Sequence, residues 1–189
     1  MGEPAEILTC GPVELRRWRL GDLDALDRAI LESREHLLPW MPWAADCGRE
    51  QTAAFLARNQ EEWAGGQAFG YAITLEGAVV GSCSLMRRIA EGGLEIGYWV
   101  HPRWTRRGLA SHAATALVCQ GLDLPGVDHF EIHHDAANLA SGAVARRLGF
   151  VQVARVAAPE GPAAPGEVGV DIIWRLTTDQ WHAGTAERG

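Results

Sequence analysis

The 189-residue sequence predicts an α+β domain with a single mixed, mostly antiparallel sheet of about seven strands and helices on both faces. Hydrophobic residues make up 47% of the chain, which is enough to bury one core. Strand-like segments outnumber helical ones, and glycine turns join them into hairpins in the middle of the chain. One strand–helix–strand crossover follows these hairpins and adds a parallel pair of strands.

The first half of the chain is expected to place two helices between an initial strand and a run of strands. In chain order the elements are a strand at 13–19, helices at 22–36 and 49–63, and strands at 69–75, 79–86 and 94–100. Asp22 can cap the first helix, whose apolar residues recur about every 3.6 positions. Pro39 and Pro42 prevent regular helix in the segment that follows it.

The second half is expected to alternate helices and strands. Its elements are a helix at 107–121, a strand at 128–134, a short helix from Asn138 to the glycine stop at Gly149, and strands at 150–156 and 170–176. All of residues 1–189 are interpreted as one domain with a core at about 13–176 and loose ends at 1–12 and 182–189.

Composition excludes several functions. The formal net charge is −7, and all 17 basic residues are arginine, so lysine-dependent phosphate loops and Schiff bases are excluded. The acidic balance argues against a nucleic-acid partner, and no apolar run is long enough for a membrane partner. The four cysteines lack metal-site spacing, and free thiols in a reducing compartment indicate a cytoplasmic protein.

The most informative segment is residues 95–114, where a strand ends and an arginine-rich loop opens a helix. Free amide groups and the positive end of the helix dipole can bind a diphosphate there, and Gly108 allows close approach of the backbone. Arg103, Arg106 and Arg107 can grip phosphate oxygens. An ordinary strand-to-helix turn with solvated arginines remains the alternative.

Four motifs in order resemble those of GNAT-fold N-acetyltransferases, in particular the branch that acetylates the N-terminal alanine or serine of ribosomal proteins. They are the pyrophosphate motif at 105–110, the N-x-x-S…LGF signature at 138–150, the E-I-G-Y-W strand at 95–99 and the tryptophan-containing segment 37–43. Gly108 and Ala110 match the pyrophosphate motif. Thr105 replaces its usual glutamine or arginine, and Arg106 stands where glycine is common.

The resemblance implies a GNAT fold, acetyl-CoA as co-substrate, no metal, and direct transfer of the acetyl group to an amine. Trp99 and Val100 would supply backbone donors to the thioester and the pantetheine arm. The remaining residues implied to bind the co-substrate are Arg103, Thr105, Arg106, Arg107, Gly108, Leu109, Ala110, Asn138 and Arg146. Glu95 is the candidate base, acting through water, and Ser141 the candidate acid toward the coenzyme A sulfur.

Each of these side chains also has a structural interpretation. Glu95 can form a rim salt bridge, Ser141 can cap its helix, and Trp40 and Trp43 can line the acceptor site or pack in the core. His133, His134 and Asp135 make a poor metal chelate, because consecutive strand residues point to opposite faces.

The sequence does not determine the identity of the acceptor amine. It is a protein N-terminal α-amine or a small-molecule amine, including an antibiotic or an aminoacyl-nucleotide whose acetylation detoxifies it. A non-catalytic acyl-CoA sensor is a further alternative, supported by the departures at Thr105 and Arg106. The protein is expected to be a monomer or a homodimer.

Overall fold

A computed structural model of the chain describes residues 3–158 and 160–186. The strands of this part are β1 (Ile7–Cys10), β2 (Val13–Arg17), β3 (Ala68–Leu75), β4 (Ala78–Met86), β5 (Gly93–Val100), β6 (His129–Asp135), β7 (Val151–Ala157) and β8 (Val170–Thr177). Its α-helices are α1 (Leu23–Leu37), α2 (Arg49–Ala64), α3 (Leu109–Leu122), α4 (Leu139–Arg147) and α5 (Thr178–Ala186).

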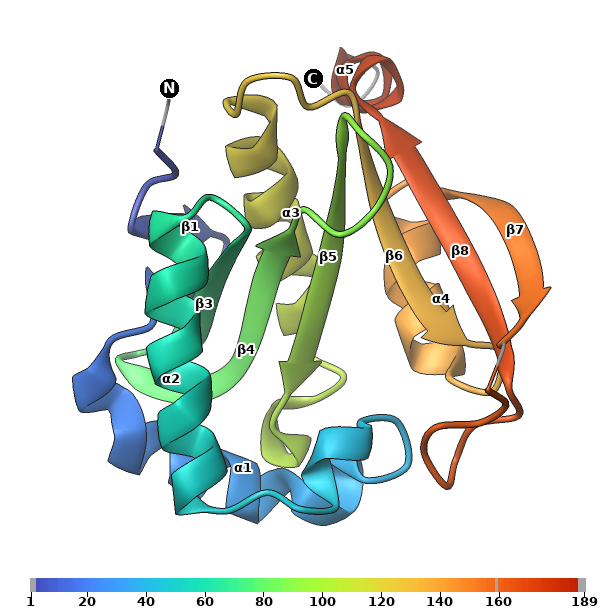
Figure 1. The fold of residues 1–189 in the computed structure, drawn as a ribbon. Helices are drawn as coiled ribbons and strands as arrows, with labels where there is room; N and C mark the ends of the chain where they lie inside the picture. The colour runs from blue at the N-terminus through green and yellow to red at the C-terminus, as the bar shows by residue number, and fades with distance from the viewer. Residues whose placement is uncertain (1–2, 159, 187–189) are drawn as a thin grey trace.

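The strands form one sheet in the order β1-β2-β3-β4-β5-β6-β8-β7 (Figure 1). Every neighbouring pair is antiparallel except β5 and β6, which are parallel and joined by a crossover through α3. The α+β class and the mixed, mostly antiparallel sheet are therefore confirmed, with eight strands where about seven were expected.

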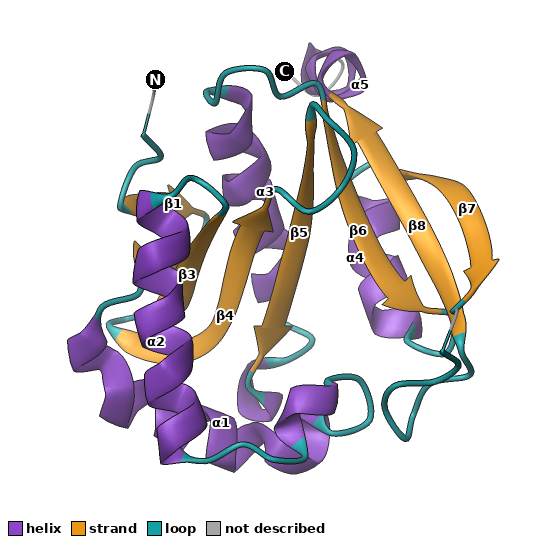
Figure 2. Ribbon diagram, in the orientation of Figure 1, coloured by secondary structure: helices purple, strands orange, loops and turns teal. Residues whose placement is uncertain are grey.

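Helices cover both faces of the sheet (Figure 2). On one face α1 packs against β4 and α2 against β3, and on the other α3 packs against β5 and α4 against β6. Alternation along β5 divides its residues between the two faces. Leu94, Ile96 and Val100 join the core beneath α3, whereas Trp99 packs beside α1 and α2.

The sheet forks between β5 and β6. The two strands pair only from Gly93 to Glu95 and from His129 to Glu131, and beyond these residues they diverge (Figure 1). The parallel pair therefore ends at Glu95, the third of the eight residues of β5. From Ile96 onward this strand keeps β4 as a neighbour on one side only.

Both ends of the chain contain structure where loose ends at 1–12 and 182–189 were expected. β1 forms a hairpin with β2 through a turn in which Gly11 has a φ of 56°. α5 follows β8 directly and buries Trp181, which is 9% exposed, in the main core. Within those two segments, residues 1–2 and 187–189 lie outside the described residues.

Candidate active site

A cavity of about 1540 Å³ opens at the fork of the sheet. Its walls come from β5, the N-terminal ends of α3 and α4, and the segment that joins α1 to α2. The predicted site residues that line it are Trp40, Trp43, Glu95, Trp99, Val100, Thr105, Arg106, Gly108, Leu109, Ala110, Asn138 and Ser141. The fold thus brings together segments that are about 100 positions apart in the sequence.

Three predicted phosphate-binding arginines do not line this cavity. The Arg107 guanidinium lies 4.7 Å from the ring centre of Trp104, and that of Arg146 lies 5.5 Å from the ring centre of Trp174. Arg103 is exposed on the loop before α3. Arg147, which the sequence analysis did not select, lines the cavity instead and donates to Ser111 Oγ at 3.0 Å.

The N-terminus of α3 forms a cradle for an anion. Gly108 is its N-cap, has a φ of 76° and provides no side-chain cap. The His112 amide donates to Gly108 O at 3.0 Å, so the amides of 109–111 precede the first turn of hydrogen bonds and point out of the helix end. Arg106 also has a left-handed backbone, with a φ of 63°, and lines the cavity beside this end.

The free edge of β5 presents backbone amides to the cavity. The His101 amide donates to Val80 O of β4 at 2.8 Å. Because hydrogen-bonding directions alternate along a strand, the Trp99 amide also points toward β4, whereas the amides of Tyr98 and Val100 point toward the fork. This side of β5 has no paired strand beyond Glu95.

Tyr98 is a cavity residue that sequence reasoning missed. Its hydroxyl lies 3.0 Å from Ser141 Oγ and donates to Ser141 O at 3.3 Å. Burial raises the pKa of Tyr98 to about 12, although the Ser141 hydrogen bond opposes this, so the phenol keeps its proton at neutral pH. Asn138 caps α4 by accepting from the Ser141 amide at 3.2 Å. The sequence signal that was not used is the alternation along β5, which places Tyr98 on the face opposite Glu95.

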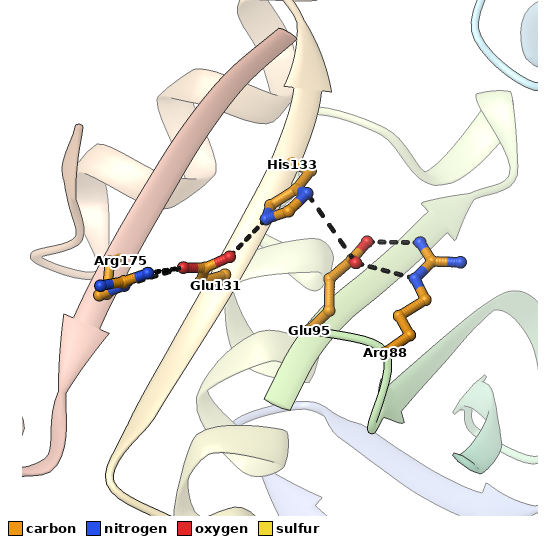
Figure 3. A network of polar contacts seen from close by, with 5 residues as sticks. All are labelled: Arg88, Glu95, Glu131, His133 and Arg175. Atoms are coloured by element: carbon orange, nitrogen blue, oxygen red, sulfur yellow. Dashed lines mark hydrogen bonds and ion pairs between the residues drawn. The ribbon is translucent and has the colours of Figure 1, made fainter. Parts of the chain in front are cut away.

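A chain of charged side chains crosses the fork (Figure 3). Arg88 binds both carboxylate oxygens of Glu95, and Glu95 Oε2 lies 3.9 Å from His133 Nδ1. His133 Nε2 lies 2.6 Å from Glu131 Oε2, and Arg175 binds the other oxygen of Glu131. Glu95 therefore does form a salt bridge at the cavity wall. His133 and Arg88 line the cavity with it.

Aromatic side chains form the opposite wall. The rings of Trp43 and Trp99 lie 6.4 Å apart between centres, tilted by 52°. Trp43 is 44% exposed and Trp40 is partly exposed, so both offer ring surface to a ligand. Trp99 belongs to the same face of β5 as Glu95, which places the aromatic wall and the charged chain on one side of the sheet.

Asp135 fastens the loop between β7 and β8 beside the cavity. Its Oδ2 accepts from the amides of Val168, Gly169 and Val170 at 2.8–3.1 Å, and Oδ1 accepts from Ala137. Burial acts to raise the pKa of Asp135, but these hydrogen bonds outweigh it and the pKa is lowered. Among the described residues no group of three or more His, Cys, Asp or Glu side chains is arranged to hold a metal ion.

A forked mixed sheet with an anion cradle beside its free strand edge defines a class of protein that binds a phosphorylated ligand in a cavity. The chain belongs to the acetyltransferase (GNAT) family, whose domain profile matches residues 13–151. It is accordingly an N-acetyltransferase. A search of the curated proteins found no match. No helix of the described residues is long and apolar enough to cross a membrane.

Solved structures with the same fold include ribosomal-protein acetyltransferases, the branch that the sequence resembles. RimL, a ribosomal L7/L12 α-N-protein acetyltransferase in complex with coenzyme A, is 23% identical over 93% of this chain and 99% of that chain, with a TM-score of 0.84. The Salmonella typhimurium acetyltransferase that modifies the N-terminal serine of L7/L12 is 23% identical over 92% and 100%, with a TM-score of 0.82. The microcin C7 self-immunity acetyltransferase MccE, in complex with acetyl-CoA and AMP, is 19% identical over 88% and 92%, with a TM-score of 0.80.

Proposed function

We propose that this protein transfers the acetyl group of acetyl-CoA directly to an amine held in the cavity at the fork. The observation that carries the proposal is that one cavity joins the anion cradle of α3, the free amides of β5 and the aromatic wall. A donor phosphate, a thioester and an acceptor can therefore occupy adjoining parts of one site. RimL with coenzyme A and MccE with acetyl-CoA support this choice of donor.

The residues at the α3 N-terminus fit the donor pyrophosphate. Its oxygens would accept from the amides of 109–111, next to the positive end of the helix dipole. The Arg106 guanidinium adds a positive charge at the same place, and Arg147 supplies a second one to the cavity. Arg106 would keep the role that the sequence analysis gave it, and Arg147 would act in place of Arg103, Arg107 and Arg146.

The β5 edge would bind the pantetheine arm and polarise the thioester carbonyl. The amides of Tyr98 and Val100 are the two that face the fork, so Tyr98 replaces Trp99 in this role. Backbone donors of this kind stabilise the negative charge that develops on a carbonyl oxygen under attack. They are fixed by the β4–β5 ladder and need no rearrangement.

Ser141 and Tyr98 would protonate the departing sulfur. The Tyr98 phenol stays protonated, and its single proton would turn from Ser141 O to Ser141 Oγ as the Ser141 proton passes to the thiolate. The cap at Asn138 uses only the Ser141 amide, so the structural and catalytic interpretations of this residue are compatible.

The amine would enter between Trp43 and the charged chain that contains Glu95. The Trp40, Trp43 and Trp99 rings suit a planar or cationic group, whether a peptide N-terminus or a small molecule. Thiol release should be measured with acetyl-CoA and a panel of N-terminal peptides, polyamines and aminoacyl nucleotides. Turnover of one amine class supports the proposal and identifies the acceptor. Tight donor binding without any turnover would instead favour an acyl-CoA sensor.

The Gly108→Asp variant tests the donor site. A carboxylate at the cradle repels the pyrophosphate, so KM for acetyl-CoA should rise about tenfold or more. Gly126→Asp is the matched control, since Gly126 also has a positive φ, of 75°, but lies in open space outside the cavity. Wild-type protein should also gain thermal stability with acetyl-CoA. No gain at saturating donor contradicts the proposal.

A further inference from the structure

Four side chains of the charged chain share one face of the sheet where β5 and β6 part. Glu95 and Glu131 are register partners across the parallel pair, and Arg175 is the register partner of Glu131 on β8. His133 follows Glu131 by two positions and therefore points to the same side (Figure 3). Two carboxylates directly opposite one another repel, and His133 lies where a positive charge would relieve that repulsion.

The hydrogen bond to Glu131 selects one form of the His133 ring. Glu131 is 4% exposed, and burial acts to raise its pKa, but the hydrogen bonds to His133 and Arg175 outweigh burial and the pKa is lowered. An ionised carboxylate only accepts, so His133 Nε2, at 2.6 Å, carries the proton. In the neutral ring Nδ1 is then a bare lone pair.

That lone pair faces the cavity and Glu95. The Nδ1 atom lies 3.9 Å from Glu95 Oε2, which is too long for a direct hydrogen bond, and a proton placed on Nδ1 is attracted by the carboxylate. Arg88 already donates to both oxygens of Glu95, so this carboxylate is engaged in a salt bridge on its other side. The His133 side chain is also the more accessible of the two, 30% exposed against 8% for Glu95.

We infer that His133, oriented by Glu131, is the base that accepts the proton of the attacking amine. This inference rests on the proposed function. The acceptor enters as an ammonium ion, and one N–H bond breaks as an Nδ1–H bond forms on His133. The neutral amine then attacks the thioester carbon and the carbon–sulfur bond breaks. Ser141 protonates the departing sulfur to form the thiol, the second proton of the amine nitrogen restores the Ser141 hydroxyl, and the imidazolium passes its proton to water.

Every charged group around the ring has a defined part in this step. Glu131 holds the ring and stabilises the imidazolium, and it is a positioning residue because it acts through His133. Glu95 stabilises the same charge from β5, in place of acting as the base itself. Arg88 and Arg175 balance the charges of the two carboxylates on their far sides. The five side chains together therefore carry no net charge while the His133 ring is neutral.

The first test compares His133→Gln with His129→Gln. Removal of the base should lower kcat about 100-fold or more, while KM for acetyl-CoA stays within about twofold. The loss of kcat should become smaller as the pH approaches the pKa of the acceptor amine, because more of the amine is then already neutral in solution. His129 lies on the same face of β6, outside the cavity and paired with Asp128, so its variant should keep wild-type kinetics.

The second test uses Glu131→Gln and the pH–rate profile. Without the carboxylate the imidazolium is less stable, so the ascending limb should move to lower pH while the plateau rate falls. Loss of structure alone would lower the rate without moving the limb. Nitrogen-15 NMR of wild-type protein should show the neutral His133 ring protonated at Nε2. This measurement needs no acceptor and does not depend on a variant that folds.

The outcomes separate this inference from the proposed function. An active enzyme whose His133→Gln variant keeps its kcat and its pH profile overturns the role of His133 and leaves acetyl transfer intact. A nitrogen-15 NMR result in which the neutral His133 ring is protonated at Nδ1 also overturns the role of His133 and leaves acetyl transfer intact. A wild-type protein that binds acetyl-CoA but acetylates no amine overturns both.

Discussion

Arg106 combines a useful side chain with an unfavourable backbone. Its φ of 63° lies in the left-handed region, which costs a residue with a Cβ atom about 1–2 kcal/mol. This explains why the motif that the sequence resembles commonly has glycine there. Arg106 lines the cavity at the α3 N-terminus, so we interpret the strained backbone as the cost of placing a positive charge near the donor phosphates.

The Arg106→Gly variant separates these two effects. Relief of strain should raise the free energy of unfolding by up to about 1 kcal/mol, after the entropy that glycine costs is subtracted. Loss of the charge should raise KM for acetyl-CoA several-fold. Glu76→Gly is the control, because Glu76 has a φ of 51° in a turn outside the cavity and should change stability alone. If the Arg106→Gly and Glu76→Gly variants bind acetyl-CoA with equal affinity, Arg106 does not contribute to the donor site. Urea unfolding and initial-rate kinetics provide the measurements.

At the scale of elements, regular periodicity accounts for most of what the sequence predicted. The strands at 69–75, 79–86 and 94–100 match β3, β4 and β5 within one residue at each end, because their alternation and glycine turns are local signals. β1 was missed because it is four residues long with an edge position, and it depends on its pairing with β2. α5 was missed because packing of Trp181, which no local pattern encodes, holds it in place.

The loop between β7 and β8 shows the same dependence on distant partners. Asp135 is the last residue of β6, yet its carboxylate accepts hydrogen bonds from the three backbone amides of 168–170. The loop also reaches the opposite side of the cavity, where the Gly166 amide donates to Pro39 O at 2.9 Å. Asp135 therefore fixes the position of a cavity wall, although the sequence analysis considered it only as a metal ligand.

The Asp135→Asn variant tests this anchor. A neutral amide cannot accept from all four backbone donors, so the free energy of unfolding at pH 7 should fall by about 1–3 kcal/mol. Because the pKa of Asp135 is lowered in the folded protein, its carboxylate stabilises the fold at pH values above the unfolded pKa of about 3.9. This stabilisation is lost as the pH falls through the folded pKa. The difference between the two proteins should therefore shrink in acid.

Urea unfolding at pH 7 and at several lower pH values measures this difference. Asp171→Asn is the control, since Asp171 is the register partner of Asp135 on β8 but only partly buried, and it should change stability little at any pH. A constant difference for Asp135→Asn at all pH values would contradict the anchor.

At the scale of the whole molecule, the contiguous parts of the site were predictable and the assembled parts were not. Thr105, Arg106, Gly108, Leu109 and Ala110 line the cavity as expected, because one strand-to-helix turn sets their positions. Which arginines turn inward depends on packing against Trp104 and Trp174. The contacts of His133 require knowledge that β6 lies between β5 and β8, which only the sheet order supplies.

The buried Glu131 carboxylate on β6 is paired with Arg175 on β8, a strand that lies about 40 positions further along the chain. Arg175→Gln should lower the free energy of unfolding by about 1–3 kcal/mol, less than for a fully buried pair because the Arg175 side chain is 42% exposed. Adding Glu131→Gln should recover part of this loss, since no buried charge then lacks its partner. The double-mutant cycle should give a coupling of about 1 kcal/mol at pH 7.

The lowered pKa of Glu131 fixes the pH dependence of that coupling. An ionised Glu131 contributes stability above the unfolded carboxyl pKa of about 4.3, and the contribution disappears as the pH falls through the lower folded value. The coupling measured by urea unfolding should therefore vanish in acid. The pair of Arg49 and Asp24, whose side chains are 60% and 76% exposed, provides the comparison, with an expected coupling below about 0.5 kcal/mol. Strictly additive effects at Arg175 and Glu131 would mean that β6 and β8 are held together by their backbone ladder alone.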